Sequence, residues 1–474
     1  MLLKDLISNI NNEFANIEIT GITSDSREIK DGYAFVCIKG VTDDGHKYAA
    51  DAASKGAVVV ITEKEMHVDN ELVVADTREV YANMCANWFG KPADSLKLIG
   101  VTGTNGKTSI TYMLKNILEH FEFKVGLIGT IHNMIGDEII ETKNTTPGVY
   151  ELNRLFAQMK EKGCQYVVME VSSHALDQKR VCNLNFDAAI FTNLTQDHLD
   201  YHITMDNYLD AKKKLFSMCK IAVVNGDDEY CTKLVEGLAC KVVSYSLGDD
   251  TTYSAKAIKY GPTSVDYELV SNNVLNHIRF NTGGKFSVYN SMCAAITSVE
   301  LGLPIVEISK AIASINGIKG RAESVPTGRD FNVIIDYAHT PDGLKNILKT
   351  FSDCEKNRVI ALFGCGGDRD KTKRPIMGGI AARYADYVIV TSDNPRSEDP
   401  EEIIKDIMVG INGSKTPVKV IVNRIEAIKY AISIAQAGDI IVLAGKGHET
   451  YQILNTGTIH LDEREVVAEA LAEL

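Results

Sequence analysis

A glycine-rich segment that ends in lysine and threonine carries the clearest chemical signal in the sequence. It reads VTGTNGKTS and lies between an apolar run at 97–101 and a helical pattern at 107–120. Backbone N–H groups at a helix N-terminus can surround a phosphate, a lysine can neutralise it, and a threonine hydroxyl can bind Mg²⁺. The strict phosphate-loop pattern requires glycine where this chain has Val101. The segment therefore predicts a variant nucleotide-binding loop, although a simple glycine-rich turn is the alternative. Its residues are Gly103, Thr104, Asn105, Gly106, Lys107, Thr108 and Ser109.

Two further motifs are expected beside this loop. Glu170 ends the apolar run YVVME, and NLTQDHLDYH follows the apolar run AAIFTN. Parallel strands end at one edge of their sheet, so Glu170 and His198 are candidates for a Mg²⁺ site there. Glu170 could instead cap the next turn. His198 and His202 are four residues apart, but without a third His or Cys nearby they do not indicate zinc.

Three consecutive lysines, Lys212 to Lys214, occur in the segment YLDAKKKLF. Such a run usually lies on a solvated helix face, and a lysine that enters a phosphate site is normally a simple cation. The residues alone do not distinguish Lys212 from its neighbours.

The elements that must position these residues follow an α/β rhythm. At about 150 residues per domain, 474 residues suggest three domains. Apolar runs and helical patterns alternate in the middle of the chain, which predicts a doubly wound parallel sheet. Residues 252–281 resemble antiparallel strands, with helices expected at 286–301 and 305–315. The βα rhythm then restarts. We expect an N-terminal domain at 1–93, a central doubly wound domain with the phosphate loop at 94–319 and a C-terminal Rossmann-like domain at 320–474.

Composition narrows the class of protein. The 50 Lys and Arg against 63 Asp and Glu give a net charge of −13, which disfavours general binding to nucleic acid. Ten cysteines without a CxxC pair favour a reducing, cytoplasmic setting. Apolar runs stop after about five residues, against the roughly 20 that a membrane span needs. The N-terminus lacks a signal-peptide cleavage pattern.

Seven motifs in order resemble the Mur ligase family over essentially the whole chain. They are TGTNGKT, MEVSSHAL, NLTQDHLDYH, YLDAKKKLF, FSVYNSMCAA, IKGRAE and DYAHTPD. The resemblance implies an ATP-dependent amide-forming enzyme of peptidoglycan precursor synthesis. It also implies an N-terminal domain for a UDP-sugar, a central ATPase and a C-terminal domain that receives an amino acid.

Carried onto this sequence, the family pattern assigns roles around the nucleotide. Lys107 and Thr108 would contact the ATP phosphates, and Glu170 and His198 would bind Mg²⁺. Lys212 would be the lysine that family members carry as a carbamate, which turns a cation into an anionic metal ligand. Asn290 would contact adenine. The residues implied to close the C-terminal domain over the nucleotide are Arg321, Asp336 and His339. The hinge motif has Lys319 where proline is usual.

Within the family, the chain most resembles the ligase that adds the third residue of the stem peptide. The supporting segments are SDSRE, KNTTP, SSHALDQKR, DNPRSEDP and GKGHETYQ. The resemblance implies that Ser24, Ser26, Val41, Thr42 and Asp43 hold the uridine nucleotide. It implies that the sugar and its dipeptide are held by Asn144, Thr145, Thr146, Ser172, Gln178 and Arg180.

The DNPR motif bears on the choice of amino acid. A second carboxylate on the incoming substrate needs a bidentate cation, and the fork of Arg396 fits that geometry. Family members with this motif add meso-2,6-diaminopimelate, and the acceptor would be UDP-N-acetylmuramoyl-L-alanyl-D-glutamate. Arg396 could instead pair with Glu398 or Asp399 on a surface loop. The implied amino-acid site consists of Arg369, Asp393, Asn394, Pro395, Arg396, Gly445 and Glu449, with Arg369 for carboxylate and Glu449 for the distal ammonium.

The implied reaction activates a carboxylate with ATP as an acyl phosphate, which an amine then attacks. Asp336 or His339 is the candidate base. Domain closure about the segment NGIKG is expected, and we expect a monomer. The alternatives are an L-lysine-adding ligase, a folylpolyglutamate synthetase-like ligase and an inactive nucleotide-binding module.

Overall fold

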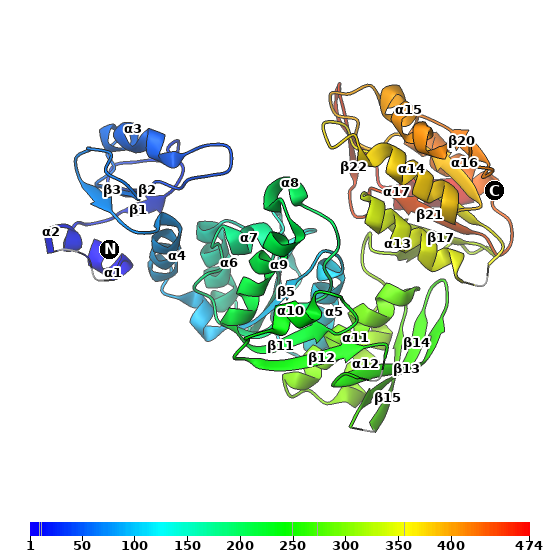
Figure 1. Ribbon diagram of the computed structural model, residues 1–474, viewed down its shortest axis with the longest axis horizontal. Helices are drawn as coiled ribbons and strands as arrows, with labels where there is room; N and C mark the ends of the chain where they lie inside the picture. The colour runs from blue at the N-terminus through cyan, green and yellow to red at the C-terminus, as the bar shows by residue number, and fades with distance from the viewer. Residues whose placement is uncertain (9, 11, 249, 273, 355) are drawn as a thin grey trace.

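Three α/β units follow one another along the chain. The computed structural model describes residues 1–8, 10, 12–248, 250–272, 274–354 and 356–474. In Figure 1 the N-terminal unit is blue, the central unit runs from cyan to light green, and the C-terminal unit is yellow to red. Each unit has its own sheet, so the chain has the α/β architecture that the sequence predicts.

The N-terminal unit is a four-stranded parallel sheet in the order β1-β2-β3-β4. Its strands are β1 (Gly21–Thr23), β2 (Tyr33–Val36), β3 (Val59–Thr62) and β4 (Glu71–Val73). Its helices are α1 (Leu3–Leu6), α2 (Asn12–Ala15), α3 (Ala49–Ser54) and α4 (Thr77–Trp88), with a 3-10 helix at Gly45–Tyr48 and another, Pro92–Ser95, leading into the central unit.

The central unit has an eleven-stranded mixed sheet in the order β15-β14-β13-β12-β11-β10-β5-β9-β6-β7-β8. The neighbouring strands from β13 to β6 in this order pair in parallel. The antiparallel strands expected at 252–281 extend this same sheet, because β13 pairs with β12. The strands are β5 (Lys97–Thr102), β6 (Val125–Ile128), β7 (Asn133–Ile135), β8 (Glu138–Ile140), β9 (Tyr166–Glu170), β10 (Phe186–Phe191), β11 (Cys219–Asn225), β12 (Lys241–Ser246), β13 (Tyr253–Tyr260), β14 (Val265–Ser271) and β15 (Val274–Phe280).

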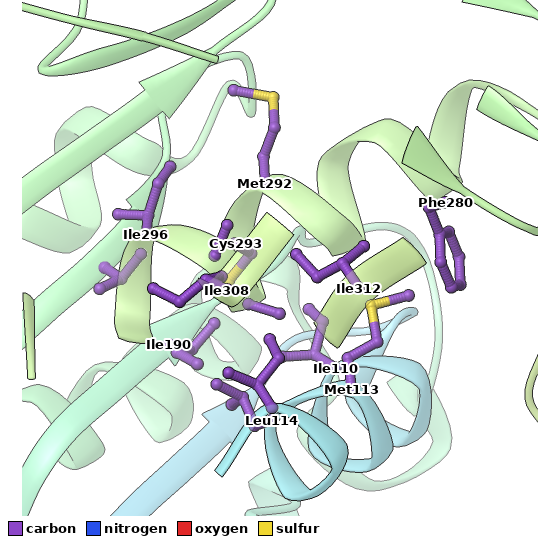
Figure 2. Packing of buried hydrophobic residues seen from close by; sticks show 14 of the residues in the cluster. Ile110, Met113, Leu114, Ile190, Phe280, Met292, Cys293, Ile296, Ile308 and Ile312 are labelled. Atoms are coloured by element: carbon purple, nitrogen blue, oxygen red, sulfur yellow. The ribbon is translucent and has the colours of Figure 1, made fainter. Parts of the chain in front are cut away.

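Helices cover both faces of this sheet, and α11 and α12 pack against the phosphate-loop helix α5. Figure 2 shows apolar side chains of α5, α11 and α12 packed together, among them Ile110, Leu114, Met292 and Ile312. A second apolar cluster includes Leu155 and Phe156 of α6. The helices are α5 (Lys107–His120), α6 (Val149–Glu161), α7 (Ser173–Asp177), α8 (Leu199–His202), α9 (Met205–Lys213), α10 (Cys231–Val235), α11 (Lys285–Glu300) and α12 (Ile305–Ser314), with a 3-10 helix at Lys214–Met218.

The C-terminal unit has a six-stranded sheet in the order β16-β17-β21-β18-β19-β20, parallel except for β16. A separate hairpin, β22 with β23, was not expected from the sequence. The strands are β16 (Glu323–Val325), β17 (Asn332–Asp336), β18 (Val359–Phe363), β19 (Tyr387–Val390), β20 (Val418–Val420), β21 (Ile440–Ala444), β22 (Tyr451–Leu454) and β23 (Gly457–His460). The helices are α13 (Pro341–Ser352), α14 (Lys373–Tyr384), α15 (Pro400–Ile411), α16 (Arg424–Ser433) and α17 (Glu463–Ala472).

Among the residues that the structure describes, no helix combines the length and the apolar character that crossing a bilayer requires.

Candidate active site

The phosphate loop joins β5 to α5, and its lysine is hydrogen-bonded to backbone carbonyls of the same loop. Lys107 Nζ donates to the carbonyl oxygens of Gly103 and Thr104, both at 2.9 Å. Gly106 has a φ of +89°, which an L side chain rarely adopts, and it caps the start of α5. The loop therefore presents backbone N–H groups and a cation at a helix N-terminus, as phosphate binding requires.

Glu170 lies against this loop at the end of β9. Its Oε1 accepts from Thr108 Oγ1 at 3.0 Å and from Thr130 N at 2.8 Å, and its side chain is buried. The cap of the following helix is Ser172, whose hydroxyl accepts from Ala175 N. Glu170 is thus a partner of the phosphate loop rather than a cap. The oxygen donors of Thr108 and Glu170 fit Mg²⁺, which prefers oxygen ligands.

The structure distinguishes Lys212 from the other two lysines of its run. Lys212 is buried, its Nζ donates to Gly103 O at 3.0 Å, and it lies 4.4 Å from the centre of the Tyr208 ring. Burial and the nearby Lys107 hold the pKa of Lys212 well below its usual range. Lys213 and Lys214 instead make surface contacts, with Lys233 O and Asp177. A buried amine with a lowered pKa is more often neutral, and the neutral amine is the nucleophilic form.

His198 begins α8 with a half-exposed side chain. Its ring lies 4.9 Å from that of His174, and its Nε2 is 3.5 Å from Asp197 Oδ2. The described part of the chain holds no cluster of three His, Cys, Asp or Glu side chains suited to a metal ion. Of the predicted Mg²⁺ ligands, Thr108 and Glu170 are in direct contact, and Lys212 contacts the same loop through Gly103.

A cavity of about 820 Å³ lies beside the phosphate loop, between the central and C-terminal units. Asn290 of α11 lines it and lies close to the loop, since a Cβ on Gly106 would be 2.7 Å from Asn290 Oδ1. Ser109, Arg321 and Asp336 also contribute to its wall. Four aromatic residues to which the sequence assigned no role line it as well: Tyr245, Tyr260, Phe286 and Tyr289, the last two within the FSVYNSMCAA motif.

Arg321 and Asp336 lie at the junction of the two units. Arg321 Nη2 donates to Thr108 Oγ1 at 3.2 Å, and its guanidinium lies over the Tyr337 ring at 4.8 Å. Asp336 uses both carboxylate oxygens to accept backbone N–H groups, from Ala322 at 2.7 Å and Ala338 at 2.8 Å. Burial raises the pKa of Asp336. Asp336 therefore fastens the hinge segment to β17.

His339 is exposed and points one ring nitrogen at a carbonyl. Its Nδ1 lies 2.8 Å from Tyr337 O. A carbonyl oxygen only accepts, so Nδ1 carries the proton and Nε2 of the neutral ring is an acceptor. His339 lines a second cavity, of about 990 Å³.

This second cavity gathers the predicted amino-acid site. Besides His198 and His339, its wall includes Arg369, Asp393, Asn394, Arg396, Gly445 and Glu449, and Pro395 lies in the same loop. Arg396 has a φ of +53°, and its Nη1 donates to Gly367 O at 2.8 Å. Arg396 forms no ion pair within the described ranges; Glu398 pairs with Arg374 at 2.9 Å, and Asp399 caps α15. The alternative of a surface ion pair for Arg396 is therefore wrong.

The residues predicted for the sugar and dipeptide form a connected group next to Glu170. Thr146 Oγ1 donates to Glu170 O at 2.9 Å, and Arg180 donates to Thr146 O at 2.8 Å and to Gln178 Oε1 at 2.8 Å. Ser172 N donates to Thr146 Oγ1 at 3.0 Å. Thr145 lies 3.1 Å from Thr130 Oγ1, which also donates to Glu170, while Asn144 is exposed.

The residues predicted for uridine follow β1 and β2 of the N-terminal sheet. Ser24 and Ser26 come directly after β1, and Val41, Thr42 and Asp43 lie in the loop after β2. Asp43 accepts from Lys47 Nζ at 2.9 Å and from Tyr48 Oη at 2.7 Å.

Two contacts between units involve residues that the sequence did not single out for a role. Arg78 of α4 donates to Lys39 O at 2.6 Å and to Gln178 O at 3.3 Å, which joins the N-terminal and central units. Asp342 of α13 accepts from Asn105 Nδ2 at 3.1 Å and from Thr195 Oγ1 at 3.0 Å. Asp342 lies in the DYAHTPD motif, but its partners are distant in the chain.

Known protein families and relatives match this chain over most of its length. Family models match residues 18–89 (Mur ligase family, catalytic domain), 101–298 (Mur ligase middle domain) and 320–447 (Mur ligase, glutamate ligase domain). A relative from Caldanaerobacter subterraneus subsp. tengcongensis, named UDP-N-acetylmuramoyl-L-alanyl-D-glutamate--2,6-diaminopimelate ligase, is 48% identical over 100% of this chain and 99% of its own length. A relative from Clostridium acetobutylicum, with the same name followed by the number 1, is 46% identical over 100% of both chains.

Solved structures are similar over most or all of the chain. A structure named as a UDP-N-acetylmuramoyl-L-alanyl-D-glutamate--2,6-diaminopimelate ligase has a TM-score of 0.76 and 33% identity, covering 100% of this chain and 98% of its own. The folylpolyglutamate synthase of Mycobacterium tuberculosis has a TM-score of 0.64 at 18% identity, covering 84% of this chain and 94% of its own, and shares the fold alone. The chain belongs to the Mur ligase family.

Proposed function

We propose that this chain is the ATP-dependent ligase that joins meso-2,6-diaminopimelate to UDP-N-acetylmuramoyl-L-alanyl-D-glutamate in peptidoglycan precursor synthesis. The observation that carries the proposal is Arg396, a cation without a carboxylate partner in the described residues, which lines the same cavity as Arg369. A bidentate arginine fits a substrate carboxylate, and L-lysine has none at its distal end. Full-length relatives that carry this name support the choice of substrate.

The proposal assigns one substrate to each domain. Residues 1–93 bind the uridine nucleotide, 94–319 bind ATP, and 320–474 bind the amino acid. Residues of both the central and the C-terminal domain line each of the two cavities, which supports a reaction at their junction. We further propose that the enzyme acts as a cytoplasmic monomer, since one chain supplies both cavities.

In the first step, the glutamate γ-carboxylate attacks the γ-phosphorus of ATP, and ADP leaves. Lys107 and the N–H groups of the phosphate loop hold the phosphates of ATP and offset their negative charge. The anionic carboxylate can therefore approach the anionic γ-phosphate. Mg²⁺, held by Thr108, Glu170, His198 and the Lys212 carbamate, would supply further neutralisation. Arg180, bonded to the Thr146 carbonyl beside Glu170, is the cation proposed for the acceptor.

In the second step, the amine attacks the acyl phosphate, and phosphate leaves the tetrahedral intermediate. The attacking ammonium must first lose a proton. Of the two candidate bases, His339 is the better supported, because its Nε2 is an acceptor and the ring lines the amino-acid cavity. Both oxygens of Asp336 already accept backbone N–H groups.

Phosphate release with ATP and UDP-N-acetylmuramoyl-L-alanyl-D-glutamate tests this function, with meso-diaminopimelate and L-lysine supplied in separate assays. We expect diaminopimelate to give the higher kcat/KM. A higher value with L-lysine contradicts the choice of amino acid. Absence of phosphate release with either amine, despite ATP binding, favours the inactive module.

The Arg396→Ala variant tests the residue that carries the proposal. Loss of a charge-assisted pair should raise the KM for diaminopimelate by at least about tenfold and leave the KM for ATP within about twofold. Arg383→Ala, which removes an exposed arginine of α14, is the matched control. Equal effects of Arg396→Ala on both KM values would indicate a structural role.

A further inference from the structure

Lys446 is a buried lysine in the loop after β21, next to the amino-acid cavity but not part of its wall. Its side chain is 0% exposed. A buried ammonium needs partners, because leaving water is costly for a charge. Lys446 Nζ donates to Glu449 Oε2 at 2.8 Å and to Asn394 Oδ1 at 3.0 Å. Both partners line the cavity.

A third hydrogen bond closes this group into a triangle. Asn394 Nδ2 donates to Glu449 Oε2 at 2.9 Å, and Asn394 Oδ1 also accepts from Ile453 N at 2.9 Å. The amide of Asn394 is therefore fixed in one orientation. Among the described residues, no hydrogen bond reaches Glu449 Oε1, so this oxygen remains available to a ligand in the cavity.

Strand β22, which contains Ile453, also holds the loop that carries Arg396. Gln452 of β22 donates to Asp393 O at 2.5 Å, and Arg396 N donates to Ile453 O at 3.1 Å. The orientation of Arg396 and that of the Lys446 triangle thus depend on one short strand, β22. Lys446 is the charged member of this assembly that is wholly removed from solvent.

We propose that Lys446 is a positioning residue for the amino-acid substrate. It fixes Asn394 and Glu449 so that Glu449 Oε1 accepts an ammonium group of a zwitterionic amino acid, while Arg396 meets its carboxylate. The inference rests on the proposed function and deepens it, since it adds a residue that acts on amino-acid binding without contact with the substrate.

The Lys446→Met variant tests the inference, because methionine keeps the chain length and removes the three donors. We expect the KM for diaminopimelate to rise by about tenfold or more. The KM values for ATP and for the UDP-linked acceptor should stay within about twofold, and kcat at saturation within about threefold. Lys446→Arg, which retains the charge and donors, should restore part of the loss.

Lys115→Met is the matched control. Lys115 is also buried and pairs with a glutamate of its own helix, Glu119, at 2.7 Å, far along α5 from the cavity. The Lys115→Met substitution should lower thermal stability and leave the KM for diaminopimelate unchanged. A Lys446→Met variant that behaves in the same way, less stable but with an unchanged KM, overturns the inference.

A double variant covers the case in which Lys446→Met does not fold. Lys446→Met combined with Glu449→Gln removes both charges, and its KM should equal that of Glu449→Gln alone if Lys446 acts through Glu449. Additive effects overturn the inference. The amine preference of the wild-type enzyme is measured first. If the wild type prefers another amine, the proposed function fails. The KM values of the wild type and the Lys446 variants for that amine still decide the role of Lys446.

Discussion

Lys212 shows how burial selects one residue from a run of three. Its amine lies against the phosphate loop, and the nearby Lys107 would repel it in the charged form. Conversion to a carbamate would replace this repulsion with attraction to Mg²⁺. Lys212→Ala should lower ligation by at least about 100-fold, in the range seen when a group that stabilises transition-state charge is lost. A short-chain carboxylic acid should restore part of the activity.

Lys214→Ala is the control for this measurement, since Lys214 belongs to the same run but is exposed and pairs with Asp177. Steady-state phosphate release should be unchanged in that variant. Full activity of Lys212→Ala without added acid would refute the carbamate.

Glu398 links the two loops that carry Arg369 and Arg396. It accepts from Arg374 Nη2 at 2.9 Å and from Asp368 N at 2.6 Å. The Arg374 guanidinium, the Asp368 N–H and Lys371 hold the pKa of Glu398 at about 2, against 4.5 ordinarily. A lowered pKa in the folded state means that the contribution to stability is complete above about pH 5 and is lost as the pH falls toward 2.

Glu398→Gln should therefore lower the free energy of unfolding at pH 7, and by less at pH 4. Urea unfolding followed by circular dichroism at the two pH values measures the difference. Glu469→Gln, an exposed glutamate of α17 without an ion pair in the described residues, is the control. An equal loss at both pH values would show that the ion pair does not set the stability of this link.

At the scale of elements, the phosphate loop needs Gly106 for two reasons, its positive φ and the close approach of Asn290. Gly106 combines a φ of +89° with a Cβ position only 2.7 Å from Asn290 Oδ1. Gly106→Ala should strain the loop by about 1–2 kcal/mol and push Asn290 into the nucleotide cavity, so the KM for ATP should rise by about tenfold. Initial rates at varied ATP concentration measure this.

The Gly136→Ala variant separates the effect of a positive φ from the effect of the contact with Asn290. Gly136 lies in the turn between β7 and β8 with a φ of +59°, but its nearest neighbour would be 3.5 Å from an added Cβ. The Gly136→Ala variant should be less stable than the wild type, but its KM for ATP should be unchanged. Equal KM values in both alanine variants would show that Asn290 and the loop do not set ATP affinity.

Elements with local signals were predictable, and those that depend on distant partners were not. Helix α5 has the bounds expected from its pattern, because the glycine before it and the apolar stripe along it are local features. Strand β13 joins the central sheet through its pairing with β12, which no periodicity encodes. The hairpin β22–β23 was missed although LNTG is a turn signal, since its strands are short and mostly exposed.

The same division applies to the site. Motif residues such as Lys107 and Glu170 were identified from strand ends and spacing, and the structure places them in contact with the same loop. Arg78 and Asp342 gain their roles from partners 100 and 237 residues away. Lys446 was part of a motif, but only its burial and its two partners distinguish it from a surface lysine.

At the scale of the whole molecule, the C-terminal unit contacts the phosphate loop directly. Asp342 at the N-terminus of α13 meets Asn105 and Thr195, and Arg321 meets Thr108. These contacts would align the amino-acid cavity with the site of the acyl phosphate. Asp342→Ala should lower kcat by about tenfold, with the KM for the UDP-linked acceptor unchanged.

Asp342→Asn is the matched variant, because an amide oxygen still accepts from Asn105 and Thr195. It should retain most of the wild-type kcat. An Asp342→Ala variant that is faster than the wild type would mean that the contact restrains the enzyme instead of aligning it.

A competition experiment tests the central claim most directly. Equal concentrations of meso-diaminopimelate and L-lysine are supplied together with ATP and UDP-N-acetylmuramoyl-L-alanyl-D-glutamate, and the nucleotide-linked products are separated by mass. Arg396 and Arg369 in one cavity predict that nearly all of the product contains diaminopimelate, and that Arg396→Ala reduces this preference. A product that contains mainly lysine, or a preference that survives the loss of Arg396, would contradict the account.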